Sequence, residues 1–149
     1  MAEAAALWAQ ASDQGESAYL TRKGVQAYAL RFSADGRVLV PMRDAGGELR
    51  NVQSINASGE KRFLPGGRKS GLWHWCGNPA GAAVLLVAEG YATAASLHQA
   101  TGRPVAVAFD AGNLAHVAKA LHAQYPAALI VVAGDDDRAT HASTGKNPG

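Results

Sequence analysis

The sequence predicts an α/β protein in which a parallel sheet flanked by helices follows a small, mainly antiparallel α+β subdomain. Two short apolar runs, residues 84–88 and 127–133, are typical of strands buried on both faces. Helical and strand-like segments alternate between them, which indicates parallel strands joined by right-handed crossovers. Upstream, short runs separated by turn signals indicate antiparallel strands. We therefore expect two domains, residues 1–80 and 81–149.

The first domain is expected to begin with two short helical segments. Residues 3–10 are rich in Ala and predict a helix, which a break at residues 12–15 ends. Residues 17–22 predict a further helical turn that Gly24 terminates. Strands then follow, with turn signals at residues 34–36 and 45–47 between the first of them. The expected strands are residues 27–32, 37–40, 49–55, 61–64 and 72–75.

The second domain alternates strand and helix. Strands are expected at the apolar runs, residues 84–88, 105–109 and 127–133. Helices are expected between them, at residues 91–101 and 113–125. Gly102 closes the first of these helices. Asn113 is the expected N-cap of the second helix, and Pro126 lies past its end. We interpret residues 110–113 first as an Asx-type cap and second as a loop of a site.

Acidic residues follow each strand of the predicted parallel sheet. Glu89 ends the first apolar run, Asp110 ends the middle one, and Asp135, Asp136 and Asp137 follow the last. In such sheets, ligands bind at the carboxyl ends of the strands. Like charges about 4 Å apart repel by roughly 4 kcal/mol at an effective dielectric near 20, so this cluster needs a cation or a proton. A solvated turn is the alternative interpretation of the Asp triplet.

The types of ligand narrow the choice of cation. Carboxylates with no Cys, and with no His beside them in the sequence, suit Mg²⁺ or Mn²⁺ better than zinc or copper. Magnesium held by one or two carboxylates keeps waters and meets substrate phosphates. Two such ions can bracket the attacking and leaving oxygens of a phosphoryl transfer. The predicted site is therefore a phosphotransfer site.

The composition sets ordinary bounds. The chain has 149 residues, 48% hydrophobic and 17% charged, which is typical of a globular protein in water. A single cysteine, Cys76, excludes an internal disulfide and a CxxC zinc site. No apolar run approaches the roughly 20 residues of a membrane span, and residues 1–10 lack the pattern of a signal peptide. We expect a cytoplasmic protein without a membrane partner.

Positive charge is concentrated in the first domain. Residues 21–80 hold ten Lys and Arg against four acids, whereas residues 81–149 hold four against five. A loop through residues 65–67 could track a phosphate backbone or hold nucleotide phosphates, and a solvated hairpin loop is the alternative. Its cations are Lys61, Arg62, Arg68 and Lys69.

Aromatic side chains lie close to these cations in the sequence. Phe63, Trp73 and Trp75 are available for stacking on bases, but the two Trp residues share one face of a strand and core packing explains them equally well. His74 points the opposite way and is interpreted as a surface or hydrogen-bonding residue rather than a ligand. The helical histidines are expected to be exposed: His98, His116 and His122.

Several motifs together resemble a known family. Glu89-Gly-Tyr-Ala-Thr-Ala94 resembles the signature hexapeptide of the primases carried by conjugative plasmids and some satellite phages. Glu89 with Asp135-Asp-Asp137 is similar to the Glu and Asp-x-Asp motifs of the Toprim domain, and the Toprim-like part runs from about residue 83 to the end. Residues 17–77 resemble the smaller subdomain that precedes Toprim in these primases, notably at residues 19–24, 40–44 and 61–67.

The resemblance implies roles for particular residues. Glu89 would be the general acid/base or a metal ligand, and Asp135 and Asp137 would hold magnesium. Thr93 stands where chromosomal-type primases carry a further Asp, so one ligand of a second metal is missing. Arg138 would either neutralise the acids or contact a substrate phosphate.

The implied function is that of a DNA primase, a nucleotidyltransferase that makes short RNA primers on single-stranded DNA from nucleoside triphosphates with magnesium or manganese. Further domains of the same polypeptide are expected, of helicase, relaxase or zinc-binding type, because a Toprim fold would continue past residues 147–149. Two alternatives remain: phosphodiester cleavage as in Toprim nucleases, and a non-catalytic nucleic-acid-binding module of a mobilisation or relaxase protein.

Overall fold

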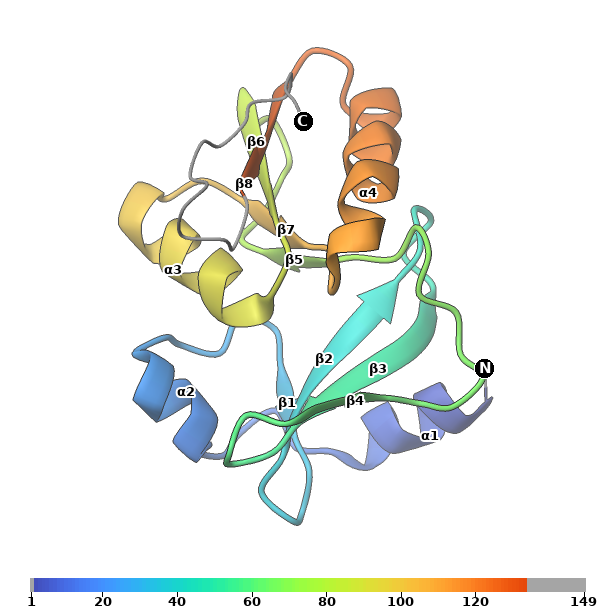
Figure 1. Ribbon diagram of the computed structural model, residues 1–149, viewed down its shortest axis with the longest axis vertical. Helices are drawn as coiled ribbons and strands as arrows, with labels where there is room; N and C mark the ends of the chain where they lie inside the picture. The colour runs from blue at the N-terminus through green and yellow to red at the C-terminus, as the bar shows by residue number, and fades with distance from the viewer. Residues whose placement is uncertain (1, 134–149) are drawn as a thin grey trace. The chain divides into compact units, whose positions relative to one another are not determined.

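The computed structural model describes residues 2–133, and its contacts divide the chain into two compact units, Met1–His74 and Trp75–Gly149 (Figure 1). The first unit holds an antiparallel sheet and the second a sheet with parallel strands, so the predicted α/β class and the order of its parts are confirmed. The predicted assignment of residues 1–80 and 81–149 to separate domains stays a prediction. Among the described residues, no helix is both long and apolar enough to cross a membrane.

The first unit is a four-stranded antiparallel sheet with two helices. The strands follow one another in space as β1-β2-β3-β4. The elements are α1 (Ala2–Gln10), α2 (Ala18–Lys23), β1 (Arg31–Phe32), β2 (Val38–Arg43), β3 (Leu49–Ile55) and β4 (Lys61–Phe63). Ala4 of α1 packs with Leu39 and Val52 in a buried cluster, because the apolar side chains of alternate strand positions face this helix.

Local signals fix the ends of α2 as the sequence predicts. The Ser17 hydroxyl caps the helix by accepting a hydrogen bond of 3.3 Å from the Leu20 N–H. At the other end Gly24 adopts φ +69°, a left-handed conformation that favours glycine, and its N–H bonds back to the helix.

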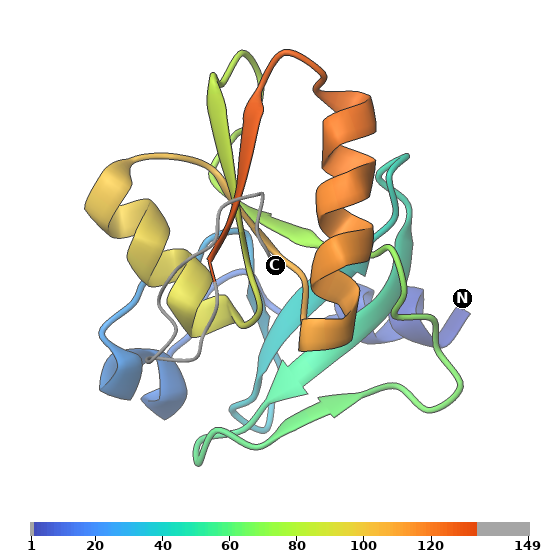
Figure 2. The same ribbon diagram turned by 45° about the horizontal axis from the view of Figure 1, so that its top comes forward.

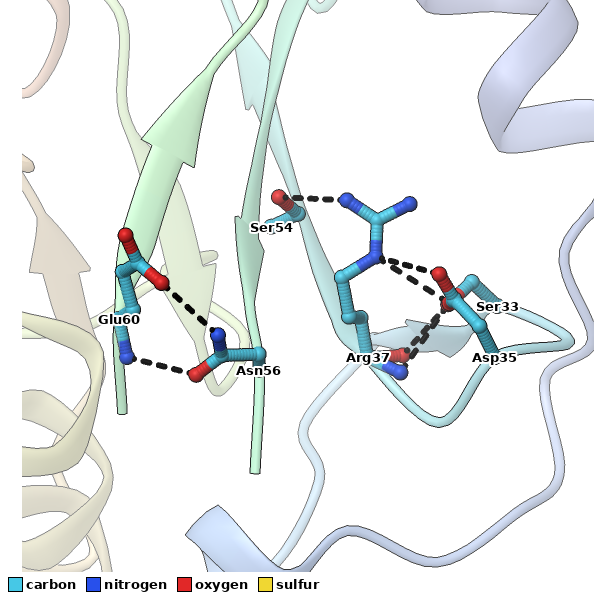
Figure 3. Close-up of polar contacts among 6 residues, drawn as sticks. All are labelled: Ser33, Asp35, Arg37, Ser54, Asn56 and Glu60. Carbon is cyan, nitrogen blue, oxygen red and sulfur yellow. Dashed lines mark hydrogen bonds and ion pairs between the residues drawn. The ribbon is translucent and has the colours of Figure 1, made fainter. Parts of the chain in front are cut away.

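Polar side chains hold the turns between the strands, as Figure 3 shows for two of them. In the β1–β2 turn, the Ser33 hydroxyl contacts the Asp35 carboxylate and accepts a hydrogen bond of 3.0 Å from the Arg37 N–H. Before β4, the side-chain Oδ1 of Asn56 accepts a 2.9 Å bond from the Glu60 N–H. These side chains accept hydrogen bonds from backbone N–H groups in the turns, which the sheet itself leaves without partners.

Two predicted strands of this unit differ from the structure. The strand expected at residues 27–32 is reduced to Arg31–Phe32, because Ala29 has a φ of 59° and turns the chain out of the extended conformation. The strand expected at residues 72–75 begins later, at His74, and belongs to the sheet of the second unit instead of the antiparallel sheet of the first. Trp73 instead exchanges backbone hydrogen bonds with Arg43, of 3.0 and 3.2 Å.

The second unit is a four-stranded sheet in the order β5-β7-β6-β8 with two helices on opposite sides (Figures 1 and 2). β6 pairs in parallel with both β7 and β8. The elements are β5 (His74–Cys76), β6 (Val84–Ala88), α3 (Tyr91–Thr101), β7 (Val105–Val107), α4 (Ala111–Gln124) and β8 (Leu129–Ala133). The helical crossovers place α3 between β6 and β7, and α4 between β7 and β8, as the alternating pattern predicts.

The burial of the strands is predicted correctly for β6 and wrongly for β8. Leu85 to Ala88 are buried in the centre of the sheet. In β8, Leu129 is 61% exposed and the other residues are half-buried. Within the described part of the chain β8 is at the edge of the sheet, with one neighbouring strand, which explains its greater exposure.

Candidate active site and basic loop

Glu89 lies at the carboxyl edge of the parallel sheet, directly after β6. Its backbone is fixed, because its carbonyl oxygen accepts a 2.8 Å hydrogen bond from the Phe109 N–H, and Ala88 accepts one of the same length from Ala108. The side chain is half-buried. In the β6–β8 register Ala88 pairs with Ala133, so the two strands that precede the acidic motifs end side by side.

The residues after Glu89 start a helix that packs on the sheet. Gly90 is the N-cap of α3, with extended backbone, and its carbonyl oxygen accepts a 3.0 Å bond from the Ala94 N–H. Tyr91 and Ala94 of the hexapeptide and Ala95 directly after it are buried and form the packed face of the helix. Glu89 therefore precedes a helix N-terminus, where the helix dipole favours a negative charge.

Asp110 caps the N-terminus of α4, a role that the sequence predicts for Asn113. Its Oδ1 accepts a 2.9 Å hydrogen bond from the Asn113 N–H, so α4 begins at Ala111 and Asp110, not Asn113, is the N-cap. Asn113 is buried and its Nδ2 donates to the Ala108 carbonyl oxygen at 2.8 Å. β7 ends at Val107 instead of residue 109, because Phe109 has a φ of 79°. The interpretation of Asp110 as a helix cap is confirmed.

The remaining predicted acids, Asp135 and Asp137, lie outside the described residues, as does Arg138. Across residues 2–133, no three His, Cys, Asp or Glu side chains are placed to hold a metal ion together. Of the three predicted ligands, only Glu89 lies in the described part of the chain, and the whole ligand set, Glu89 included, stays a prediction.

The four predicted phosphate-binding cations lie on β4 and on the loop that follows it, a segment that we call the basic loop (residues 61–69). All four side chains belong to exposed residues: Lys61, Arg62, Arg68 and Lys69. Arg62 forms an ion pair of 2.9 Å with Glu60, so an acid adjoins the loop although none lies within it. The Lys69 Nζ lies 4.6 Å from the centroid of the Phe63 ring.

Asn51 of β3 anchors the basic loop from inside. Its side chain is fully buried. Its Nδ2 donates a 2.9 Å hydrogen bond to the Arg68 carbonyl oxygen, and its Oδ1 accepts bonds from the N–H groups of Leu64, at 3.3 Å, and Val52, at 2.8 Å. Gly67 lies so close that a Cβ there would be 2.5 Å from Asn51 Nδ2. Asn51 is not among the residues predicted from the sequence, where its only signal is that Asn is depleted in strands.

The structure resolves the alternatives for the nearby aromatic and histidine side chains. Trp73 is 4% exposed, so core packing is the correct interpretation for it. Trp75 is half-buried and meets Tyr125 edge to face at 6.2 Å between ring centroids. His74 is buried, so the surface alternative is wrong, and the hydrogen-bonding alternative is confirmed because its Nε2 donates a 2.8 Å hydrogen bond to the Tyr28 carbonyl oxygen.

The helical histidines agree with expectation on α4, where His116 and His122 are exposed. His98 on α3 is half-buried, and its Nδ1 donates a 2.8 Å hydrogen bond to the Arg103 carbonyl oxygen. That bond ties the end of the helix to the turn before β7. None of the three lies beside another predicted site residue in the sequence.

Comparison with known proteins agrees with this geometry. The Toprim domain family matches residues 84–147, a span that contains both Glu89 and the Asp triplet. Two Escherichia coli proteins, each called DNA primase TraC, are 43% identical to this chain over 136 residues and cover 88% of it. The chain spans only 13% and 9% of the lengths of these relatives. On these findings, residues 84–147 are similar to the Toprim domain, and the chain is similar to a fragment of these two DNA primases.

Proposed function

We propose that this chain forms part of the catalytic core of a DNA primase, which makes short RNA primers on single-stranded DNA from nucleoside triphosphates. The observation that carries the proposal is the parallel pairing of β6 with β8. Within the Toprim match, it brings the ends of the two strands that precede Glu89 and the Asp triplet to the same edge of the sheet. Neighbouring strands lie about 4.8 Å apart, a separation that carboxylates sharing a cation can span.

The residues fit a hard divalent cation. Glu89, Asp135 and Asp137 would hold Mg²⁺ or Mn²⁺, because all three offer carboxylate oxygens and the sequence places no Cys or His beside them. The bound ion would supply electrostatic stabilisation for the triphosphate and for the attacking primer hydroxyl. Glu89, at the start of α3, would orient or accept the proton of that hydroxyl.

The cations of the chain would position the nucleic acid and the nucleotide. The template or nucleotide phosphates would contact the four exposed cations Lys61, Arg62, Arg68 and Lys69. Binding of Lys and Arg to a phosphate backbone is favourable because it releases the cations condensed on that backbone. Arg138 directly follows the Asp triplet in the sequence and would contact the triphosphate.

The test is primer synthesis by the chain on single-stranded DNA with labelled ribonucleotides and magnesium. We expect labelled oligonucleotides from the wild type and none from the Asp135→Ala, Asp137→Ala double variant. Asp136→Ala is the matched control, because it removes an acid from the variable middle position of the same triplet, and it should retain synthesis.

Full activity of the double variant would overturn the proposal. Magnesium-dependent cleavage of labelled DNA, lost in the double variant, would assign the site to a nuclease instead. DNA binding without incorporation or cleavage, unchanged by removal of magnesium, would assign the chain to a non-catalytic module.

A further inference from the structure

We propose that Phe63 is a stacking platform for an unpaired base of single-stranded DNA, and that the basic loop binds the phosphates beside that base. The inference rests on the proposed binding of nucleic acid by the basic loop. It goes further by naming the side chain through which the loop would distinguish a single strand from a duplex, in which bases are stacked on each other and out of reach.

Phe63 is the aromatic residue of this segment whose position suits such contact. Trp73 is buried and its backbone is paired with Arg43. Trp75 packs edge to face against Tyr125. Phe63 is half-buried as Trp75 is, but it lies on β4, an edge strand of the described antiparallel sheet, and directly follows the exposed Lys61 and Arg62. An aromatic ring among cations is the arrangement that binds a single strand without regard to sequence.

One face of the Phe63 ring is covered by a cation that can exchange partners. The Lys69 Nζ lies 4.6 Å from the ring centroid, at the end of an exposed and flexible side chain. A cation over a ring at an exposed position is held more weakly than a base stacked on the same ring. When a strand binds, Lys69 would move from the ring to a phosphate and the base would take its place.

A second cation over an aromatic ring in the same unit shows the contrast. The Arg31 guanidinium lies 4.5 Å from the Trp8 ring centroid, and its Nη1 also donates a 2.8 Å hydrogen bond to the Trp8 carbonyl oxygen. That bond and the planar guanidinium tie α1 to β1. Trp8 therefore serves as a matched control, a ring covered by a cation in a structural pair.

The backbone of the basic loop is already ordered for binding. Asn51 bonds to the N–H of Leu64 and to the carbonyl oxygen of Arg68, and Gly67 packs directly against its amide. Because the buried Asn51 fixes both ends of this turn, binding would order side chains only. Binding by this ordered loop then costs less conformational entropy than binding by a flexible loop would.

Two of the cations are available without breaking an ion pair. Within residues 2–133, neither Lys61 nor Arg68 forms a salt bridge, whereas Arg62 is paired with Glu60 at 2.9 Å. The Arg68 Nε donates to the Ser70 carbonyl oxygen at 2.9 Å, which leaves its other N–H groups to face a ligand. Lys61 and Arg68 are therefore expected to contribute most of the salt dependence of binding.

The experiment measures fluorescence anisotropy of a labelled oligothymidylate and of a strand of the same length with abasic residues, each titrated with the chain. We expect Phe63→Leu to weaken binding of the oligothymidylate by about tenfold and to leave binding of the abasic strand unchanged. The Lys61→Ala, Arg68→Ala variant should weaken binding of both strands. It should also reduce the steepness of the slope of log affinity against log salt concentration by roughly 1.4. Trp8→Leu should bind both strands as the wild type does.

Two outcomes overturn the inference. If Phe63→Leu binds the oligothymidylate as the wild type does, no base stacks on the ring. If it weakens binding of both strands equally, the ring supports the loop structurally. In either case the Lys61 and Arg68 variant reports separately on the proposed nucleic-acid surface, because unchanged binding by that variant would show that the basic loop is not the binding surface.

Discussion

The two units use their acidic residues in different ways. In the first unit, Asp35, Asp44 and Glu60 each pair with an arginine two to six residues away. Hydrogen bonds from Ser33 and Arg37 lower the pKa of Asp35. In the second unit, acids follow the parallel strands, with Glu89 after β6 and Asp110 after β7.

This difference follows from the two kinds of sheet. An antiparallel sheet is joined by tight turns, whose free backbone groups short polar side chains can bind. Parallel strands are joined by helical crossovers, so their carboxyl ends meet at one edge, and a polar side chain placed there faces the same ligand as its neighbours. Asp35, Asp44 and Glu60 of the first unit therefore support the fold, and we expect the acids at the edge of the second to support the chemistry.

The largest expected effect comes from exchanging an acid in each unit for its amide. Glu89→Gln should lower the initial rate of primer synthesis by about 100-fold to 10,000-fold, because the amide can neither transfer a proton nor bind a divalent cation well. Glu60→Gln should keep a rate close to that of the wild type, since it loses only an exposed ion pair with Arg62. The measurement is incorporation of labelled ribonucleotides on single-stranded DNA.

Thermal unfolding controls for damage to the fold. Glu89→Gln is similar in shape and half-buried, so both variants should unfold close to the wild type. Equal rates for Glu89→Gln and Glu60→Gln would show that Glu89 has no greater role in primer synthesis than Glu60.

The next effect concerns a buried polar side chain, His74 at the start of β5, and is measured as a change in stability. Burial lowers the pKa of His74 from 6.5 to about 4, and the nearby Arg43 charge acts in the same direction. Between these two values the unfolded chain takes up a proton that the folded chain does not. The free energy of unfolding should therefore fall as the pH drops from 6.5 toward 4, by about 3 kcal/mol in total.

Urea unfolding of the wild type and of His74→Gln, each near neutral pH and near pH 4, isolates this contribution. The Gln side chain can still donate to the Tyr28 carbonyl oxygen and does not titrate. The variant should lose less stability on acidification than the wild type does. An identical acid loss in both proteins would show that His74 does not cause it.

Much of the second unit could be predicted from the sequence because its signals are local. The helix at residues 91–101 and its terminator Gly102 were predicted at the observed positions, since propensity and the glycine stop act within one turn. The position of Glu89 directly after a strand is predicted in the same way, from an apolar run that ends at an acid. The helix cap was misassigned to Asn113 because Asp110 and Asn113 are both good caps, and only the hydrogen bond distinguishes them.

The errors lie where distant residues decide the conformation. No local pattern reveals that Ala29 adopts a positive φ, or that His74 is buried against the Tyr28 carbonyl oxygen. The contact between Asn51 and Gly67 joins residues far apart in the sequence. The cations of the basic loop could be predicted from composition, but the anchor that shapes the loop could not.

That anchor gives a third test, which probes how tightly the first unit is packed beneath its charged surface. Gly67→Ala should lower the free energy of unfolding by about 1–3 kcal/mol, because the new methyl group would meet Asn51 Nδ2 at 2.5 Å and its Cγ at 2.8 Å. Gly46→Ala is the matched control, since its methyl group would meet only the Asp44 Oδ1, at 3.5 Å. Urea unfolding of both variants measures the difference. Equal stability of Gly67→Ala and Gly46→Ala would show that the Asn51 side chain can move to accommodate the methyl group at little cost.

The smallest effect concerns Asp110, the acid of the second unit that behaves like those of the first. Asp110→Ala removes the cap of α4 and should lower the free energy of unfolding by about 1 kcal/mol, whereas Asp110→Asn keeps an oxygen that can accept the Asn113 N–H. Measuring thermal unfolding and primer synthesis on both variants separates two roles. If Asp110→Asn keeps stability and activity, Asp110 is a cap. If it keeps stability and loses activity, its charge serves the metal site, and the carboxyl edge of the sheet then contributes an acid from β7 as well as from β6.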